Sequence, residues 1–208
     1  MKSGGFITVE GIEGAGKSTA IARIRQWLKG KGHDVVVTRE PGGTPLGEEI
    51  RSLLLAHRQG GMAPETEALL MFAARAEHLR TLIEPALATG QWVVCDRFSD
   101  ASSAYQGAGR QLGMDQIKVL AQWTHPGLEP DLTLWLDVPV ELGLRRANGR
   151  SRPDRFESEK AVFFEAVRQG YAQLTAEAPQ RIRRIDASAD LATVTAGIEA
   201  VLERHFND

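Results

Sequence analysis

The chain has 208 residues, of which 42% are hydrophobic and 25% are charged, a length and composition that suit one well-buried domain. A formal net charge of −2 excludes a broad electrostatic attraction to nucleic acid or to an anionic membrane. The single cysteine, Cys95, excludes an intrachain disulfide and a cysteine-cluster metal site.

No basic-then-apolar leader precedes the first strand-like run, and no apolar run approaches the length of a membrane span. The sequence therefore predicts a cytoplasmic protein.

The first predicted elements surround a glycine-rich loop. Residues 6–10 predict a strand, residues 19–31 have the apolar spacing of an amphipathic helix, and residues 11–18 between them read G-I-E-G-A-G-K-S. This order of strand, loop and helix gives the G-x-x-x-x-G-K-[ST] pattern the context of a phosphate-binding loop. Backbone N–H groups in such a loop surround phosphate oxygens, and the helix N-terminus adds its positive dipole end. The sequence therefore predicts a nucleoside triphosphate site.

Two side chains of this loop carry specific expectations. Lys17 would reach the β- and γ-phosphates, and the Ser18 hydroxyl would bind Mg²⁺. The residues expected to bind ATP are Gly11, Ile12, Glu13, Gly14, Ala15, Gly16, Lys17, Ser18 and Thr19.

Short apolar runs then alternate with long amphipathic stretches. The further predicted strands are residues 34–38, 92–96, 131–137 and 181–186, and the further predicted helices are residues 64–89, 114–124, 159–176 and 191–206. Strands separated by helices favour a doubly wound five-stranded parallel sheet of the α/β class, covered on both faces. Ligands of such sheets bind beyond the carboxyl ends of the strands, where glycine-rich or polar runs follow Glu10, Thr38 and Cys95.

Asp96 and several arginines suit a second phosphate site at this edge. Asp96 closes the third strand, where it would orient Mg²⁺ directly or through water, although capping of the next helix explains the same residue. Arg39, Arg75 and Arg97 are candidate phosphate ligands, because a guanidinium matches phosphate oxygens with two parallel hydrogen bonds.

Residues 148–155 combine glycine, proline and arginine between two predicted helices. We interpret residues 148–156 as an arginine-rich lid on a single domain of residues 1–208. The lid would bring Arg150, Arg152 and Arg155 to the transferred phosphoryl group.

Other nucleotide-binding classes fit less well. A GTPase needs an N-K-x-D type segment, and the only asparagines are Asn148 and Asn207. Motor ATPases normally carry larger domains. A small kinase, with an acceptor site and a lid that excludes water, is therefore the favoured interpretation.

The chain resembles the bacterial type of the thymidylate kinase family. The resemblance rests on V-E-G-I-E-G-A-G-K-S-T at 9–19, T-R-E-P-G-G-T at 38–44, D-R-F-S-D-A-S-S-A-Y-Q-G at 96–107 and the R-x-R-x-x-R pattern at 150–155. It implies transfer of the γ-phosphoryl group of ATP to dTMP, giving dTDP for dTTP biosynthesis, with Mg²⁺ and as a homodimer.

The resemblance also implies roles for individual residues. Glu13 would lie near the sugar 3′-hydroxyl of the monophosphate, and Arg97 would bind its phosphate. Ser102 would hydrogen-bond the base edge, with Gln106 one turn further along. Tyr105 would crowd the 2′ position of the sugar and so exclude a ribose. The expected catalytic residues are Lys17, Arg97, Arg150, Arg152 and Arg155, and the expected dTMP-binding residues are Glu13, Arg39, Pro41, Phe72, Arg75, Arg97, Ser102, Tyr105 and Gln106.

One helix departs from the family pattern. Many relatives place a base-stacking phenylalanine four residues before the arginine, whereas here Phe72 precedes Arg75 by three and Met71 by four. Both spacings share a helical face, so either side chain can be the one that contacts thymine.

Two classes of alternative stay open. One is a deoxynucleoside kinase or a kinase for another pyrimidine monophosphate. The other is a non-catalytic switch whose ATP-bound state recruits a partner.

Overall fold

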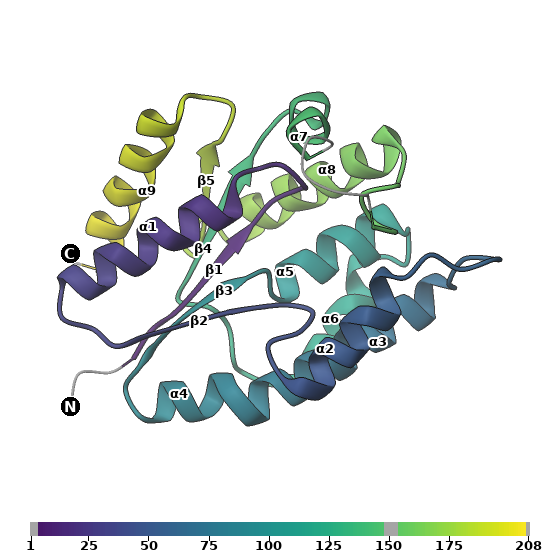
Figure 1. Ribbon diagram of the computed structural model, residues 1–208, viewed down its shortest axis with the longest axis horizontal. Coiled ribbons are helices and arrows are strands. Elements are labelled where there is room, and N and C mark those ends of the chain that lie inside the picture. Colours follow the sequence, from purple (N-terminus) through teal and green to yellow (C-terminus); the bar gives the residue numbers. More distant parts are fainter. Residues whose placement is uncertain (1–3, 148–153, 207–208) are drawn as a thin grey trace.

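The computed structural model describes residues 4–147 and 154–206, which contain an all-parallel sheet of five strands between two layers of helices (Figure 1). The strands are β1 (Phe6–Glu10), β2 (Val35–Arg39), β3 (Trp92–Asp96), β4 (Leu132–Asp137) and β5 (Ile182–Asp186). Their order across the sheet is β2-β3-β1-β4-β5, so β1 is central and the chain crosses over it between β3 and β4.

Helices occupy the crossovers. They are α1 (Lys17–Gly30), α2 (Pro45–Leu55), α3 (Pro64–His78), the π-helical turn η1 (Leu79–Ile83), α4 (Glu84–Ala88), α5 (Ser99–Ser102), the π-helical turn η2 (Ser103–Gly109), α6 (Met114–Thr124), α7 (Val140–Ala147), α8 (Ala161–Glu177) and α9 (Leu191–Phe206). In Figure 1, α1 and α9 lie together on one side of the sheet, and α2, α3, α4 and α6 lie on the other. In the described part of the chain, no helix is both long and apolar enough to cross a membrane.

The predicted doubly wound parallel sheet is confirmed. Every predicted strand is present within one residue at each end. The long helix predicted over residues 64–89 is present as α3, η1 and α4, because a π-helical turn interrupts it. The helix α2 was not predicted, and it lies beside the candidate site.

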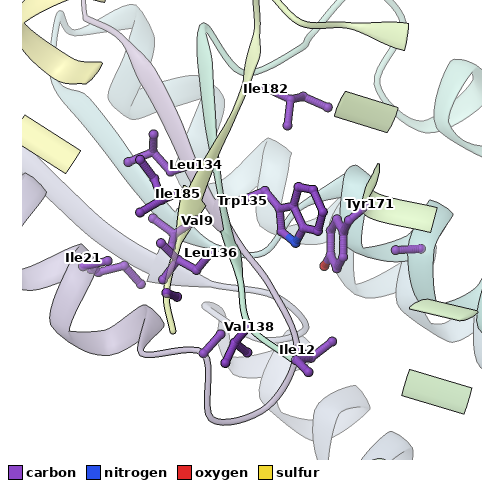
Figure 2. Close-up of a cluster of buried hydrophobic side chains, with 14 of the residues drawn as sticks. Val9, Ile12, Ile21, Leu134, Trp135, Leu136, Val138, Tyr171, Ile182 and Ile185 are labelled. Atoms are coloured by element: carbon purple, nitrogen blue, oxygen red, sulfur yellow. The ribbon is translucent and has the colours of Figure 1, made fainter. Parts of the chain in front are cut away.

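The core fixes the carboxyl edge of the sheet. All residues of β1 and β4 are buried, as expected for central strands covered on both faces. Trp135 of β4 stacks on Tyr171 of α8, with ring centroids 6.0 Å apart and planes at 22° (Figure 2). Burying each large side chain stabilises the fold by about 1.5–3 kcal/mol, so the strand ends are held firmly for the loops that follow them.

Candidate active site

The phosphate-binding loop connects β1 to α1 at the carboxyl edge of the sheet. Gly16 occupies the N-cap of α1 with φ of 93°, a left-handed conformation that favours glycine. A Cβ atom on Gly14 would lie 2.0 Å from the backbone oxygen of Gly143, so the tip of the loop packs directly on α7. The first turn of α1 contributes Ser18 and Thr19, both exposed.

Lys17 reaches back over the loop. Its Nζ atom lies 3.3 Å from the carbonyl oxygen of Gly11 and 3.4 Å from that of Ile12. Burial, and then the neighbouring Arg97, lower the pKa of the Lys17 ammonium. An anion placed against this ammonium would relieve both unfavourable effects.

Adjacent strand ends bring the predicted residues together. In the sheet register, Asp96 of β3 lies beside Val9 of β1 on one side and Arg39 of β2 on the other. A cavity of about 240 Å³ opens at this edge. Its lining includes the predicted residues Glu13, Lys17, Arg39, Pro41, Arg75, Asp96, Arg97, Ser102, Tyr105 and Gln106.

Arg97 is held in an unusual backbone conformation. Its φ is 72°, which is rare for a residue with a side chain, and its N–H donates to the Val9 carbonyl oxygen. The guanidinium carbon lies 4.6 Å from the centre of the Tyr105 ring, and Nη2 donates to Glu13 at 2.9 Å. The Arg97 Nη1 atom is buried without a partner in the described part of the chain, so it is free to bind an anion.

Glu13 and Tyr105 complete this group. The Tyr105 hydroxyl donates to the Glu13 carboxylate, with its oxygen 3.0 and 2.9 Å from the two carboxylate oxygens. Burial and the nearby Glu13 carboxylate raise the pKa of Tyr105 well above its ordinary value, despite the opposing effect of Arg97. The Tyr105 hydroxyl therefore stays protonated, and it fixes the ring at the wall of the cavity.

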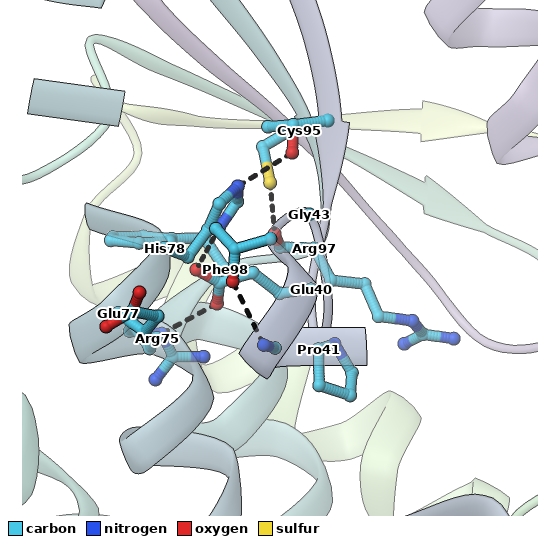
Figure 3. Close-up of polar contacts among 12 residues, drawn as sticks. Glu40, Pro41, Gly43, Arg75, Glu77, His78, Cys95, Arg97 and Phe98 are labelled. Carbon is cyan, nitrogen blue, oxygen red and sulfur yellow. Dashed lines mark hydrogen bonds and ion pairs between the residues drawn. The ribbon is translucent and has the colours of Figure 1, made fainter. Parts of the chain in front are cut away.

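A second buried group surrounds Arg75 (Figure 3). Arg75 Nε donates to Glu40 at 2.7 Å, and Nη2 donates to the Ser102 hydroxyl at 3.0 Å. His78 Nδ1 donates to the other Glu40 oxygen at 3.0 Å. Burial alone would raise the pKa of Glu40, but Arg75 and His78 together lower it below its ordinary value. Glu40 therefore orients Arg75 as a charged partner.

This group joins Arg75 to Ser102, the residue predicted at the base edge, by the hydrogen bond from Nη2. The phosphate-binding role of Arg75 stays a prediction. Like Arg97, Arg75 has a buried nitrogen, Nη1, without a partner among the described residues.

Phe72 does not line the cavity, whereas Met71 does. Phe72 is buried against Ala68 and Ile117, and its ring faces the Arg75 guanidinium at 4.6 Å. Successive residues of an α-helix are rotated by about 100° around its axis, so the side chains of Met71 and Phe72 point in different directions. Phe72 thus supports Arg75, and Met71 faces the cavity.

The residues of the predicted lid divide into two sets. Arg150 and Arg152 lie outside the described residues. Arg155 donates from Nη1 to Glu67 at 2.6 Å and from Nε to the Leu54 carbonyl oxygen at 2.8 Å, and it does not line the cavity. Asp154, Phe156 and Glu157, its neighbours, do line it.

Two charged side chains stand out among the cavity residues that sequence reasoning missed. Glu40 and Arg51 line the cavity, and Arg51 Nη1 donates to the Pro41 carbonyl oxygen at 2.9 Å. Burial and the nearby Arg39 lower the pKa of Arg51. The sequence signal that could have identified Arg51 was the Thr44-Pro45 pair. This pair marks the start of a helix and places Arg51 two turns into α2.

Asp96 does not cap the helix that follows it. Its Oδ1 atom is buried without a hydrogen-bond partner among the described residues. Phe98, which occupies the N-cap of α5, makes no side-chain cap there. Three or more acidic, histidine or cysteine side chains do not gather anywhere in residues 4–147 and 154–206 as a metal site. A metal here would therefore need substrate oxygens or water as further ligands.

A second cavity, of about 200 Å³, lies on the other side of the phosphate-binding loop. Gly14, Ala15, Gly16, Thr19 and Ala20 line one wall. Another wall is lined by Arg146 of α7, by Ala187 and Ala189 of the connection between β5 and α9, and by Leu191 of α9. Arg146 Nη1 donates to the Ala187 carbonyl oxygen at 2.8 Å, which closes this wall. The two cavities share Gly14, so the loop separates two sites within one edge of the sheet.

Comparisons with known proteins agree with one another. The family model described as thymidylate kinase matches residues 9–198. A thymidylate kinase of Alkalilimnicola ehrlichii is 62% identical over 203 residues, which cover 97% of this chain and 94% of the relative. The thymidylate kinase of Nitrosomonas europaea is 55% identical over 208 residues, covering 100% and 96%, and that of Teredinibacter turnerae is 54% identical over 201 residues, covering 97% and 98%.

Proposed function

This chain belongs to the thymidylate kinase family, and we propose that its two cavities hold the two substrates of that activity, dTMP in the larger and ATP in the smaller. The chain is an enzyme that transfers a phosphoryl group from ATP to dTMP, giving dTDP and ADP. The observation that carries the assignment of sites is the shared wall: one loop, with Lys17 at its base, separates a cation-lined cavity from a second cavity.

The donor site uses the loop of residues 11–19. Backbone N–H groups and Lys17 hold the triphosphate of ATP, and its base enters the second cavity beside Arg146. Arg146 is a residue that the sequence did not suggest. A guanidinium held flat by the Ala187 carbonyl oxygen offers a planar face to an aromatic base.

The acceptor site has a phosphate end and a base end. Arg97, Arg39 and Arg51 surround the phosphate, because these cations lie where the strand ends face the loop. Glu13 and Tyr105 hold the sugar between them. Arg75, Ser102, Gln106, Met71 and Pro41 form the base end. We therefore assign Arg75 to the base, since its Nη2 donates to Ser102 and its unpartnered Nη1 suits a carbonyl oxygen of thymine.

Asp96 and Ser18 are the residues that would hold Mg²⁺, directly or through water. Bound with the triphosphate, Mg²⁺ would neutralise charge on its oxygens. The orphaned Asp96 oxygen supports this assignment.

The chemistry needs positioning more than proton transfer. The acceptor oxygen of dTMP is already anionic, so no general base is required. Lys17 and Arg97 neutralise charge from the donor and acceptor sides. Arg150 and Arg152, in the arginine-rich segment, supply the further cations. Arg155 anchors that segment to Glu67 instead of contacting substrate.

We also propose a homodimer built from a single domain of residues 1–208. The α3 and α6 helices pack together and leave Leu69, Val119 and Trp123 exposed, with Trp123 at 83%. An indole ring this exposed is unusual on the surface of a monomer, and a second copy of the chain would bury it in a dimer interface. The cytoplasmic location remains a prediction from the sequence.

A coupled assay of ADP release across acceptors tests the proposed function. We expect kcat/KM to be highest with dTMP and much lower with thymidine, dCMP and UMP. A preference for thymidine would contradict the acceptor site, because an uncharged acceptor gives Arg97 nothing to bind. ATP hydrolysis that no acceptor stimulates would instead favour a nucleotide-dependent switch.

A further inference from the structure

Glu67 of α3 is a buried carboxylate to which the proposed mechanism gives no role beyond the anchoring of Arg155. Its side chain is 0% exposed, and every partner is a nitrogen donor from another element. Arg110 Nε lies 3.1 and 3.0 Å from its two oxygens, Arg155 Nη1 lies 2.6 Å from Oε2, and Gln106 Nε2 lies 2.8 Å from Oε1. Burying a carboxylate costs several kcal/mol of desolvation free energy, and the attraction of its partners must offset this cost. We therefore ask what these partners gain from Glu67.

The chemistry of these partners fixes the orientation of Gln106. Two guanidinium groups hold Glu67 as a carboxylate, which can only accept hydrogen bonds. Although burial lowers it, hydrogen bonding to Glu67 raises the pKa of Arg110, in keeping with that pairing. Gln106 must therefore turn its NH₂ group toward Glu67, and its carbonyl oxygen must point the other way.

That carbonyl oxygen belongs to a residue of the larger cavity. Gln106 lines the cavity, and its Oε1 has no hydrogen-bond partner among the described residues. Arg75 Nη1, at the same end, is an unpartnered donor. The base end thus presents one acceptor and one donor. This pattern matches the N3–H and the 4-carbonyl of thymine and opposes the bare N3 and 4-amino group of cytosine.

We propose that Glu67 is a specificity-determining positioning residue, which locks the Gln106 amide so that the acceptor site selects a pyrimidine with a proton on N3. This inference rests on the proposed placement of the base beside Gln106. Without Glu67 as a pure acceptor, the amide can rotate by half a turn. It would then offer its NH₂ group to the bare N3 of cytosine.

The test uses Glu67→Gln, because a carboxamide of the same size can donate to Gln106 as well as accept. Glu159→Gln is the matched control: Glu159 bonds Arg110 Nη1 at 2.6 Å in the same cluster and is not a partner of Gln106. The ligands are dTMP and 5-methyl-dCMP, which share the methyl group and differ only at positions 3 and 4. Their dissociation constants are measured by calorimetry, and folding by circular dichroism.

We expect wild type and Glu159→Gln to prefer dTMP by the same factor. In Glu67→Gln that factor should fall at least about tenfold, since one mismatched buried hydrogen bond is relieved. The affinity for an ATP analogue should stay unchanged. A purely structural role would weaken both pyrimidine nucleotides alike, which leaves the ratio intact and overturns the proposal.

If Glu67→Gln does not fold, Glu67→Asp replaces it. The shorter side chain keeps the charge for the two arginines but draws the carboxylate back from Gln106, so the same loss of preference is expected. A preserved preference in the folded variant overturns the role of Glu67 alone. Equal binding of both nucleotides by wild type would instead contradict the proposed placement of the base.

Discussion

At the scale of single residues, the walls of the larger cavity combine groups that restrain one another. Tyr105 contributes a ring to the cavity and a hydroxyl to Glu13, and the same ring lies under Arg97. The ring and the hydroxyl thus have separable functions, one steric and one electrostatic.

We expect Tyr105→Ala to reduce the preference for dTMP over its ribose counterpart several-fold, because no ring then crowds the 2′ position. Tyr105→Phe should keep the preference, since it removes only the hydroxyl. Values of kcat/KM with both nucleotides provide the readout. If Tyr105→Ala discriminates as wild type does, the ring has no part in sugar selection.

Glu10, at the end of β1, predicts a pH-dependent stability. It is fully buried and accepts hydrogen bonds from Phe98 N and from the Tyr171 hydroxyl, both at 2.7 Å. Burial, and then the nearby Asp100, raise the pKa of Glu10 from 4.5 to about 8. Between these two values the folded chain holds a proton that the unfolded chain has lost. The contribution of Glu10 to the free energy of unfolding therefore falls as pH rises through this window.

The slope amounts to at most about 1.4 kcal/mol per pH unit. Urea unfolding at pH 6.0 and pH 8.5 should show a larger loss of stability for wild type than for Glu10→Gln, which cannot ionise. Equal losses in the two proteins would mean that Glu10 ionises normally inside the fold.

At the scale of elements, we propose that the arginine-rich segment of residues 148–156 has an anchor and a reactive part. Arg155 bonds Glu67 and Leu54, whereas Arg150 and Arg152 lie outside the described residues. We expect at least one of the variants Arg150→Ala and Arg152→Ala, the one that removes the essential arginine, to lower kcat by about 10³-fold. The affinity for dTMP should change little.

Arg155→Ala should mainly lower the free energy of unfolding, by about 1–3 kcal/mol, because it removes a buried partner of Glu67. Single-turnover kinetics and thermal unfolding separate the two effects. Undiminished turnover in both Arg150→Ala and Arg152→Ala would refute the catalytic role of the segment.

Local patterns predicted the strands and α6 and α9 well, because apolar periodicity and glycine signals lie within each segment. The π-helical turns could not be predicted in this way. In η2, the wider π-helical turn sets the direction of the Gln106 side chain. Gln106 can therefore hydrogen-bond Glu67, although the two residues are 39 positions apart in the sequence. The choice between Met71 and Phe72 likewise depended on how α3 packs on Ile117, which no local spacing reveals.

At the scale of the whole molecule, the strand order β2-β3-β1-β4-β5 is what joins distant motifs. It lays the ends of β1, β2 and β3 side by side, so that the loop at residues 11–16, Arg39 and Asp96 share one edge. The sequence predicted that such residues follow strand ends. The second cavity, with Arg146, depended on the approach of α7 to the β5–α9 connection and was missed.

The exposed face on α3 and α6 makes a prediction about assembly. Trp123→Glu should convert the proposed dimer into a monomer, because a charge would be buried at the contact. Val162→Glu, on an exposed aliphatic of α8, is the matched control and should stay dimeric. Sedimentation velocity measures both, and a dimer that survives Trp123→Glu would place the contact elsewhere.

Calorimetric titration of dTMP, into protein already saturated with a non-hydrolysable ATP analogue and Mg²⁺, tests the two-site account most directly. We expect dTMP to bind once per chain under these conditions, with an affinity no weaker than in the absence of the analogue. Displacement of one nucleotide by the other would contradict the account, because donor and acceptor must occupy the two sides of the phosphate-binding loop together.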